Sequence, residues 1–297
     1  MDILNKLKHI DFNNSSPEDI IRILELKPIL TILSSVNKGV YILRTRKGGN
    51  FTKRSQMTYR PIKMCNSMQR ATLAGNTVFY GVISDNQSHL ENARVISVCE
   101  CSSLCRKGKE SIGREKFSIS YWEVVKPLNV ISFIADTTFP GIQNNMLLNY
   151  LRKAFEIESK LLPEEDKDVF RFISSEFSKT VNDPKEYLIS ATIATTILNS
   201  EGKKIDGIVY PSVQLGGQAG LNIAISPRAV NKKLRFVRVV DNTLYKNKEQ
   251  SVIRIEKVIE RSSKTKVLRT NITNQELKEM LDIDSLSILP ILDKTSD

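Results

Sequence analysis

A long stretch of the chain carries many positive charges and no negative ones. No Asp or Glu lies between Glu25 and Asp85. Arginine suits two-pronged phosphate contacts, and such charge-assisted hydrogen bonds are about twice as strong as neutral ones. We interpret this acid-free window as a phosphate pocket, with a solvated basic face and a nucleic-acid stripe as alternatives. Its basic residues are Lys27, Lys38, Arg44, Arg46, Lys47, Lys53, Arg54, Arg60, Lys63 and Arg70.

Two further segments hold side chains that could contact a ligand. The segment QRATLAGNTVFYG places Arg70 ten residues before Tyr80, and KIDGIVYPSVQ places Ser212 just beyond an apolar run. Taken singly, Tyr80 is explained as a half-buried strand aromatic and Ser212 as a turn hydroxyl. The glycines of LGGQAGLN do not fit a dinucleotide-binding turn, because LNIAIS after them reads as a strand and that motif needs a helix.

The cysteines do not form a recognisable metal or catalytic motif. Cys99, Cys101 and Cys105 have C-x-C-x3-C spacing, whereas zinc sites use paired C-x2–4-C knuckles. His89 is the one histidine in this region, and no residue is evident that would orient it for a catalytic thiol. We therefore interpret the three cysteines as strand and loop thiols, and we expect no metal.

Composition limits the class of protein. The chain has 297 residues, 40% hydrophobic and 26% charged, which is typical of a folded globular protein. A net charge of +11 favours an anionic partner. No apolar run approaches the ~18 residues of a membrane span, and the first residues lack the features of a signal peptide. We expect a cytoplasmic protein with reduced thiols.

The elements follow the order strands, helices, strands. Ser16 and Pro17 predict a helix start, and the apolar residues beyond Pro28 are expected to continue or restart that helix. The pattern then predicts strands in GVYILR, NTVFYGVI, ARVISVC, FSISYW and PLNVISFIAD, helices from about 147 to 198, strands in IDGIVYPS, LNIAIS, LRFVRVV and SVIRIEKVI, and a short terminal helix in TNQELKEMLDI. This order predicts a mixed α+β fold without regular βαβ alternation.

Several segments together resemble the RES domain, a family named for its Arg, Glu and Ser residues. YILRTR looks like the opening strand of the family, with Arg44 as its arginine. RATLAGNTVFYG is similar to the next motif and gives Arg70 and Tyr80. ARVISVCECSSL resembles the strand that delivers the glutamate, which gives Glu100, although Glu91 fits the usual spacing from the tyrosine better.

The resemblance extends from Gly39 to about Val240. DGIVYPSV and the following GLNIAI resemble the C-terminal signature, which gives Ser212 and Asn222. The implied division is an N-terminal helical extension (1–37), a RES-like catalytic domain (38–240) with a helical insert at about 141–179, and a C-terminal strand and helix extension (241–297). The insert and extensions exceed the compact members of the family.

The resemblance implies a fold like that of the ADP-ribosyltransferases and cleavage of the nicotinamide–ribose bond of NAD, with water or phosphate as acceptor. It further implies a toxin or defence effector of the bacterial toxin–antitoxin type, for which an antitoxin or regulatory protein is the expected partner. Self-association as a homodimer is left open.

The implied chemistry suits these residues. Nicotinamide leaves as a neutral molecule from a cationic precursor, so the leaving group needs no general acid, in contrast to ordinary glycoside hydrolysis. Glu100 is assigned to stabilise the positive charge that develops on the ribose. Arg44 and Arg70 are assigned to the phosphates, Tyr80 to the nicotinamide or its ribose, and Ser212 to a hydrogen bond with the substrate.

Three alternatives remain. ADP-ribosyl transfer to a macromolecule would use the same site with another acceptor. A non-enzymatic nucleic-acid-binding protein would show steep salt dependence, but no zinc-finger spacing, aromatic RNA-binding signature or helix-turn-helix pattern is present. A catalytically silent module is the third, and in it the predicted site residues would not converge.

Overall fold

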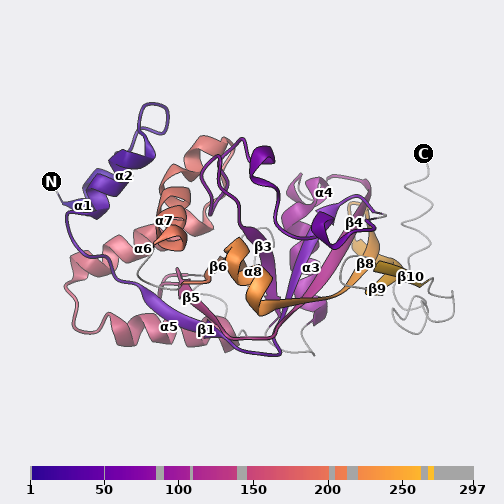
Figure 1. The fold of residues 1–297 in the computed structure, drawn as a ribbon. Coiled ribbons are helices and arrows are strands. Elements are labelled where there is room, and N and C mark those ends of the chain that lie inside the picture. The colour runs from indigo at the N-terminus through magenta and orange to yellow at the C-terminus, as the bar shows by residue number, and fades with distance from the viewer. Residues whose placement is uncertain are drawn as a thin grey trace. The chain divides into compact units, whose positions relative to one another are not determined.

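The computed structural model describes residues 2–49, 51–84, 90–107, 110–138, 146–200, 205–212, 220–261 and 267–270 (Figure 1). The fold is mixed α plus β, which confirms the predicted class at that level. The chain forms two compact units. Unit 1 comprises Met1–Lys38, Tyr59–Tyr80 and Val124–Leu234, and unit 2 comprises Gly39–Thr58, Gly81–Glu123 and Arg235–Asp297. The predicted division at 37/38 and 240/241 stays a prediction.

Unit 1 contains a mixed sheet with the strand order β1-β5-β6-β7. Strands β5 and β6 run parallel, with Ile131 opposite Ile208, and the other neighbours are antiparallel. Every residue of β6 and β7 is buried, as expected for apolar runs covered on both faces. The strands are β1 (Ile32–Val36), β5 (Leu128–Ser132), β6 (Gly207–Pro211) and β7 (Leu221–Ile225).

The N-terminal segment differs from the prediction after Pro28. Helix α2 (Pro17–Leu24) begins at the predicted Ser16 cap, where Ser16 and Asp19 form a capping box. The chain beyond Pro28 forms strand β1 instead of more helix, so the prediction of helix there is wrong. Proline stops a helix, and the β-branched run that follows it buries Ile32 and Val36 while pairing with β5.

The helices of unit 1 enclose an aromatic core. The rings of Phe133 and Phe177 stack with centroids 4.4 Å apart, and Phe170 packs between Phe133 and Phe155 at 6.0 and 5.1 Å. Helix α7 contacts α2 and α6, and α1 also contacts α6 (Figure 1). The helices predicted between 147 and 198 are confirmed. The helices are α1 (Ile3–Lys8), α2, α5 (Met146–Glu158), α6 (Glu164–Ser178), α7 (Leu188–Asn199) and α8 (Pro227–Lys233), with 3-10 turns η2 (Ile62–Met64) and η4 (Pro184–Tyr187).

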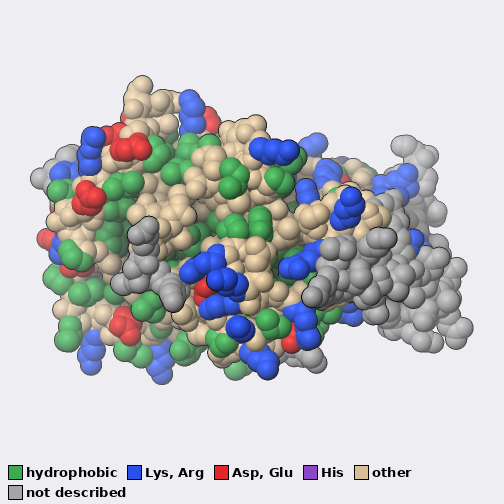
Figure 2. Space-filling model, viewed as in Figure 1, with side chains coloured by type: hydrophobic (Ala, Val, Ile, Leu, Met, Phe, Trp, Pro, Cys, Tyr) green, Lys and Arg blue, Asp and Glu red, His purple; other side chains and the backbone are tan. Residues whose placement is uncertain are grey.

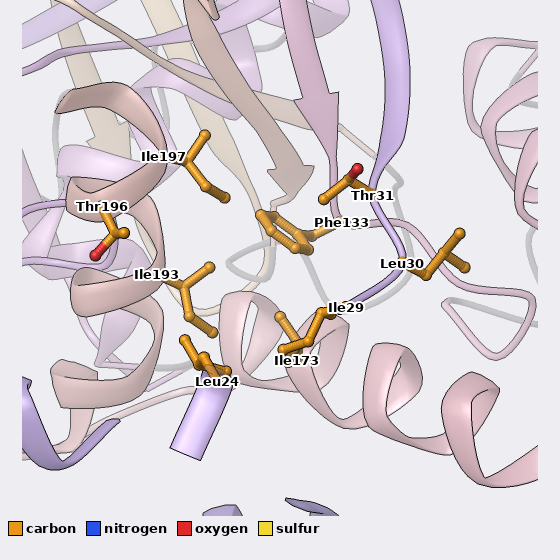
Figure 3. A pocket seen from close by; sticks show the side chains of 9 residues that line it. All are labelled: Leu24, Ile29, Leu30, Thr31, Phe133, Ile173, Ile193, Thr196 and Ile197. Atoms are coloured by element: carbon orange, nitrogen blue, oxygen red, sulfur yellow. The ribbon is translucent and has the colours of Figure 1, made fainter. Parts of the chain in front are cut away.

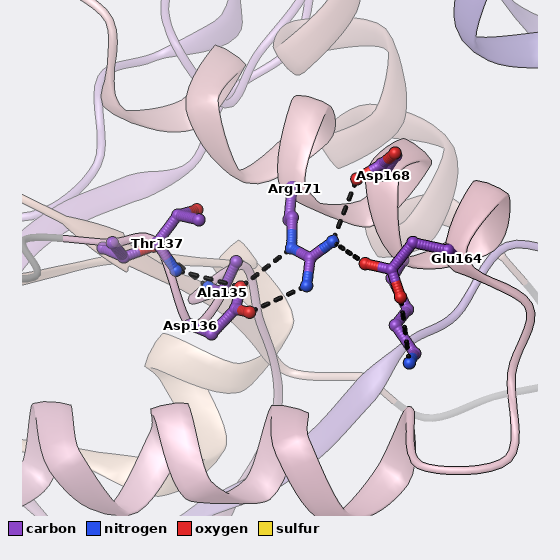
Figure 4. A network of polar contacts seen from close by, with 8 residues as sticks. Ala135, Asp136, Thr137, Glu164, Asp168 and Arg171 are labelled. Atoms are coloured by element: carbon purple, nitrogen blue, oxygen red, sulfur yellow. Dashed lines mark hydrogen bonds and ion pairs between the residues drawn. The ribbon is translucent and has the colours of Figure 1, made fainter.

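An ion-pair network anchors α6 to the turn that follows β5. Arg171 donates to both carboxylate oxygens of Asp136, at 3.0 and 2.8 Å, and also contacts Glu164 and Asp168 (Figure 4). The hydrogen bonds from Arg171 hold the pKa of Asp136 below its ordinary value. The network fixes the first half of α6 and so positions the second half, where Phe177 lies.

Unit 2 contains most of a second set of strands, in the order β3-β2-β4-β8-β9-β10. Arg44 in β2 lies opposite Ser120 in β4, and β2 also pairs antiparallel with β3. A register shift near Asp241 bends the pairing of β8 with β9. The elements are β2 (Tyr41–Lys47), β3 (Phe79–Ser84), β4 (Gly113–Val124), β8 (Leu234–Lys246), β9 (Ser251–Arg261) and β10 (Val267–Thr270), with the 3-10 turn η1 (Arg54–Gln56).

The segment ARVISVC is a helix, so its prediction as a strand is wrong. It belongs to α3 (Leu90–Cys101), which is followed by the short α4 (Ser103–Arg106). Its Val and Ile residues favour a strand by local preference, but α3 packs against β2, where Thr45 Oγ1 donates to Ser97 Oγ at 2.7 Å. Tertiary packing therefore decides the conformation. The terminal helix predicted in TNQELKEMLDI lies outside the described residues, and so does the loop LGGQAG except for Gly220.

No helix within the described ranges is long and apolar enough to cross a membrane.

Candidate functional site

Arg70 and Tyr80 lie together in unit 1. The backbone N–H and carbonyl groups of Gln69 and Thr72 bond to each other at 2.9 and 3.0 Å, which forms a tight turn with Arg70 and Ala71 at its tip. Tyr80, in β3, accepts the N–H of Ala71 at 3.1 Å, and its Oη lies 2.9 Å from Thr72 Oγ1. The turn and the phenol therefore hold each other in place.

The phenol of Tyr80 stays protonated at neutral pH. Burial raises the pKa of Tyr80 to about 12, although the hydrogen bonds from Thr72 and Ala71 and the charge of Arg70 act in the opposite direction. A neutral phenol can both accept and donate hydrogen bonds. The aromatic body of Tyr80 is half-buried and packs against the core of unit 1.

Arg70 is held by two groups of the same unit. Its Nη1 donates to the backbone carbonyl of Phe177 at 2.9 Å, and its guanidinium carbon lies 5.0 Å from the centre of the Tyr187 ring. The last carbonyls of a helix lack intrahelical partners, so Arg70 caps the end of α6. This contact uses one of the five N–H donors of a guanidinium.

A buried carboxylate that was not predicted from the sequence lies near this arginine. Glu176 is 6% exposed, and Lys179 Nζ lies 2.6 Å from its Oε2. Burial raises the pKa of Glu176, while the charges of Lys179 and Arg70 act against that rise. A signal was present in the sequence, because Glu176 follows Ile173 by three residues and precedes Phe177, both on the apolar face of α6.

Ser212 directly follows strand β6, and Asn222 lies in the neighbouring strand β7 of unit 1. Asn222 in β7 is opposite Tyr210 in β6, and the backbone N–H of Ser212 donates to the carbonyl of Gly220 at 2.8 Å. Both side chains are buried. The Tyr210 ring lies 5.8 Å from that of Phe177, the residue whose carbonyl accepts the Arg70 hydrogen bond. Four of the predicted site residues therefore lie in unit 1, namely Arg70, Tyr80, Ser212 and Asn222.

Arg44 and Glu100 belong to unit 2. Thr45 faces α3, so Arg44, one residue earlier in the strand, points to the opposite face of the sheet. Glu100 lies in the last turn of α3, and its backbone carbonyl accepts a hydrogen bond from Arg106 at 3.1 Å. The sequence predicts a strand that delivers Glu100, and this support for Glu100 is wrong because the segment is helical. Glu91 lies in the first turn of α3, and its side chain is outside the described part of the structure.

The structure describes contacts for several cations of the acid-free window. Its cations are divided between the two units. Lys27 pairs with Asp166, Lys47 pairs with Glu115 at 2.6 Å, and Arg54 lies over the Trp122 ring at 5.1 Å. On the face shown in Figure 2, Lys and Arg side chains occur in several separate groups. Arg70 is therefore the window residue best placed beside other predicted site residues.

Unit 1 also has an apolar cavity of about 160 Å³. The Phe133 ring lies among Ile193 and Ile197 of α7, Ile173 of α6 and Leu24 of α2 (Figure 3). Its lining comprises apolar side chains and two threonines, with no cation to hold a phosphate. Pockets for drug-sized ligands are typically about 300–1,000 Å³, so this cavity does not suit a dinucleotide.

Among the described residues, no group of three or more His, Cys, Asp or Glu side chains is arranged to hold a metal ion. No protein-family model matches the chain, and no curated protein shows significant similarity to it. The resemblance to the RES domain therefore rests on the segments quoted above.

Proposed function

We propose that the protein cleaves the bond between nicotinamide and ribose in NAD. The observation that carries the proposal is the cluster of Arg70 and Tyr80. The Tyr80 hydroxyl bonds Ala71 and Thr72 of the turn that carries Arg70, and Arg70 bonds the carbonyl of Phe177. A fixed cation beside a neutral phenol suits a substrate that joins phosphates to an aromatic base. Ser212, just beyond β6, and Asn222, in the adjacent strand β7, supply polar groups for the ribose hydroxyls.

Arg70 has the role of phosphate ligand. Its contacts with a carbonyl and an aromatic ring hold the guanidinium in place without neutralising its charge. Guanidinium and phosphate form strong charge-assisted hydrogen bonds. Arg44, the other predicted phosphate ligand, keeps that assignment as part of the same proposal.

Tyr80 has the role of packing against the nicotinamide or its ribose. Its raised pKa keeps the phenol neutral, so this side chain places no negative charge against the NAD phosphates. One carboxylate then stabilises the oxocarbenium-like ribose. We assign this to Glu100 or to Glu91, which occupy opposite ends of α3.

Product analysis tests the proposal and identifies the acceptor. Purified protein is incubated with NAD in the presence and absence of phosphate, and products are separated by chromatography. Free nicotinamide with ADP-ribose indicates water as acceptor, and ADP-ribose 1″-phosphate indicates phosphate. Label from NAD that becomes attached to protein or nucleic acid would instead indicate transfer to a macromolecule. Intact NAD under every condition would refute cleavage.

A cellular role follows from the same activity. A protein that removes NAD would act as a toxin or defence effector and would need a restraining partner such as an antitoxin. The test is induced expression with measurement of cellular NAD, beside a variant that has lost cleavage in vitro. Growth arrest that is equal for both proteins would contradict this role.

A further inference from the structure

Two cysteine sulfurs of unit 2 lie next to each other. The Sγ atoms of Cys99 and Cys105 are 3.4 Å apart, and both cysteines are free thiols. Cys99 is 6% exposed, in α3, whereas Cys105 is partly exposed, in α4. A disulfide has an S–S length of about 2.05 Å, so a movement of little more than 1 Å would bring the sulfurs to bonding distance.

The break between the two helices creates this approach. On one continuous helix, residues six apart point about 120° away from each other. Ser102 interrupts the helix with an extended backbone (φ −78°, ψ 126°), and its N–H donates to the Val98 carbonyl at 2.8 Å. The chain then starts α4, where Cys105 N–H donates to Ser102 Oγ at 3.1 Å. The turn returns Cys105 to the side of Cys99.

The turn is firmly held. Ser102 is fully buried, and its hydroxyl donates to Glu115 Oε2 at 2.5 Å. Glu115 also pairs with Lys47 Nζ at 2.6 Å and accepts a hydrogen bond from the Ser103 hydroxyl. Polar contacts that join α4, β2 and β4 therefore hold the turn that brings the two sulfurs together.

The two thiols have different chemical character. The hydrogen-bond contact with Cys99 in the first place, and that with Ser102, lower the pKa of Cys105 to about 6. Burial and Glu115 oppose this shift, and the charge of Lys246 supports it. The hydrogen-bond contact with Cys105 and burial raise the pKa of Cys99. Cys105 is thus the more exposed and more acidic thiol, and the thiolate is the reactive form.

Cys101 is held away from this pair. Its Sγ donates to the Thr45 carbonyl at 3.3 Å. Burial raises the pKa of Cys101 to about 11. It therefore provides a matched control within the same segment.

We propose that Cys99 and Cys105 form a peroxide-responsive dithiol, in which Cys105 reacts first and Cys99 closes the disulfide. The Cys105 thiolate attacks one peroxide oxygen, the O–O bond breaks, hydroxide leaves and Cys105 becomes a sulfenic acid. The Cys99 sulfur then attacks the Cys105 sulfur, the S–O bond breaks, and the Cys99 proton leaves with hydroxide as water. Two thiols are oxidised and one peroxide is reduced to water. The proposal is independent of NAD cleavage.

Mass spectrometry of the intact chain after hydrogen peroxide treatment tests the proposal. The wild type should lose the mass of two hydrogen atoms, and a dithiol reductant should restore it. Digestion after Arg94, Glu100 and Arg106 separates Cys99 from the peptide that holds Cys101 and Cys105. The two peptides should be recovered joined, in both wild type and Cys101→Ser, where the linkage can only be Cys99 to Cys105.

The single variants give distinct results. Cys99→Ser should accumulate a sulfenic acid at Cys105 that reacts with dimedone, and Cys105→Ser should remain reduced at Cys99 under the same exposure. A bond between Cys101 and Cys105, or no bond in Cys101→Ser, would overturn the proposal. Labelling of the unmodified wild type with limiting iodoacetamide at pH 7 should modify Cys105 before Cys99 and Cys101. Preferential labelling of Cys99 or Cys101 would contradict it without any variant.

Discussion

The guanidinium of Arg70 lies over the ring of Tyr187, 5.0 Å from its centre. Together with the hydrogen bond to Phe177, this contact fixes a positive charge through groups that carry no formal negative charge. Cation–π contacts contribute about 0.5–2 kcal/mol, enough to favour one side-chain position. An arginine that is already oriented loses less entropy when it binds a phosphate, which is the role proposed for Arg70.

Replacing Arg70 should weaken NAD use. Arg70→Ala should raise the KM for NAD about tenfold or more, because hydrogen bonds to charged groups contribute about 1.5–3 kcal/mol. Lys63→Ala is the matched control, since it removes an exposed positive charge from the same acid-free window. Initial rates at several NAD concentrations give the KM of each variant. An equal rise in KM for the two variants would show that overall positive charge, and not a contact made by Arg70, binds NAD.

Removing the Tyr80 hydroxyl should destabilise unit 1. Tyr80→Phe leaves the N–H of the buried Ala71 without its acceptor, which should lower the free energy of unfolding by about 1–2 kcal/mol. Urea denaturation at pH 7 measures this. Tyr150→Phe, at a side chain that is 67% exposed, should leave stability unchanged within about 0.5 kcal/mol.

The same pair of variants gives a pH test. The pKa of Tyr80 is about 12 in the fold and 10.0 ordinarily, so its neutral form stabilises the fold below pH 10. That contribution is lost as pH rises from 10 to 12, because the unfolded chain ionises first. The stability advantage of wild type over Tyr80→Phe should therefore shrink across this range. An advantage that grows with pH would contradict the assigned protonation state.

Glu115 should contribute to stability except in acid. Burial opposes its ionisation, but hydrogen bonds from Lys47, Ser102 and Ser103 outweigh this and lower the pKa of Glu115 to about 2. The contribution is fully present above the ordinary pKa near 4.5 and is lost as pH falls toward 2. Glu115→Gln should therefore cost about 2–3 kcal/mol at pH 7 and much less at pH 3.

The exposed Glu110 is the control for this prediction. Its side chain is 79% exposed and pairs with Lys248, so Glu110→Gln should have little effect at either pH. Urea denaturation at pH 7 and pH 3 compares the three proteins. Equal costs for Glu115→Gln at both pH values would show that its hydrogen bonds do not depend on the charge.

Local pattern predicted most of the regular structure. The buried runs of β5, β6 and β7 and the apolar spacing of α5, α6 and α7 are confirmed because one or both faces of each element meet the core. The prediction failed in α3, where buried positions occupy most of the circumference and β-branched residues obscure the helical period. Thr45 and Ser97 anchor that helix, and a contact 52 residues apart has no local signature.

The convergence of the candidate site residues stays a prediction. Arg70, Tyr80, Ser212 and Asn222 lie in unit 1, although nothing in composition predicts the carbonyl of Phe177 as a partner of Arg70. The choice of Glu100 depended on a strand that is a helix. The approach of Cys99 to Cys105 depends on the break at Ser102, so spacing alone could not predict it.

The most direct measurement of the central claim is nicotinamide release from NAD by wild type, Glu91→Gln and Glu100→Gln under identical conditions. Loss of one well-placed electrostatic group typically costs about 2.7–4 kcal/mol of transition-state stabilisation. We predict release by the wild type and a decrease of about a hundredfold or more in one of the two variants, with the other close to wild type. No release by the wild type, or equal release by all three proteins, would contradict the account.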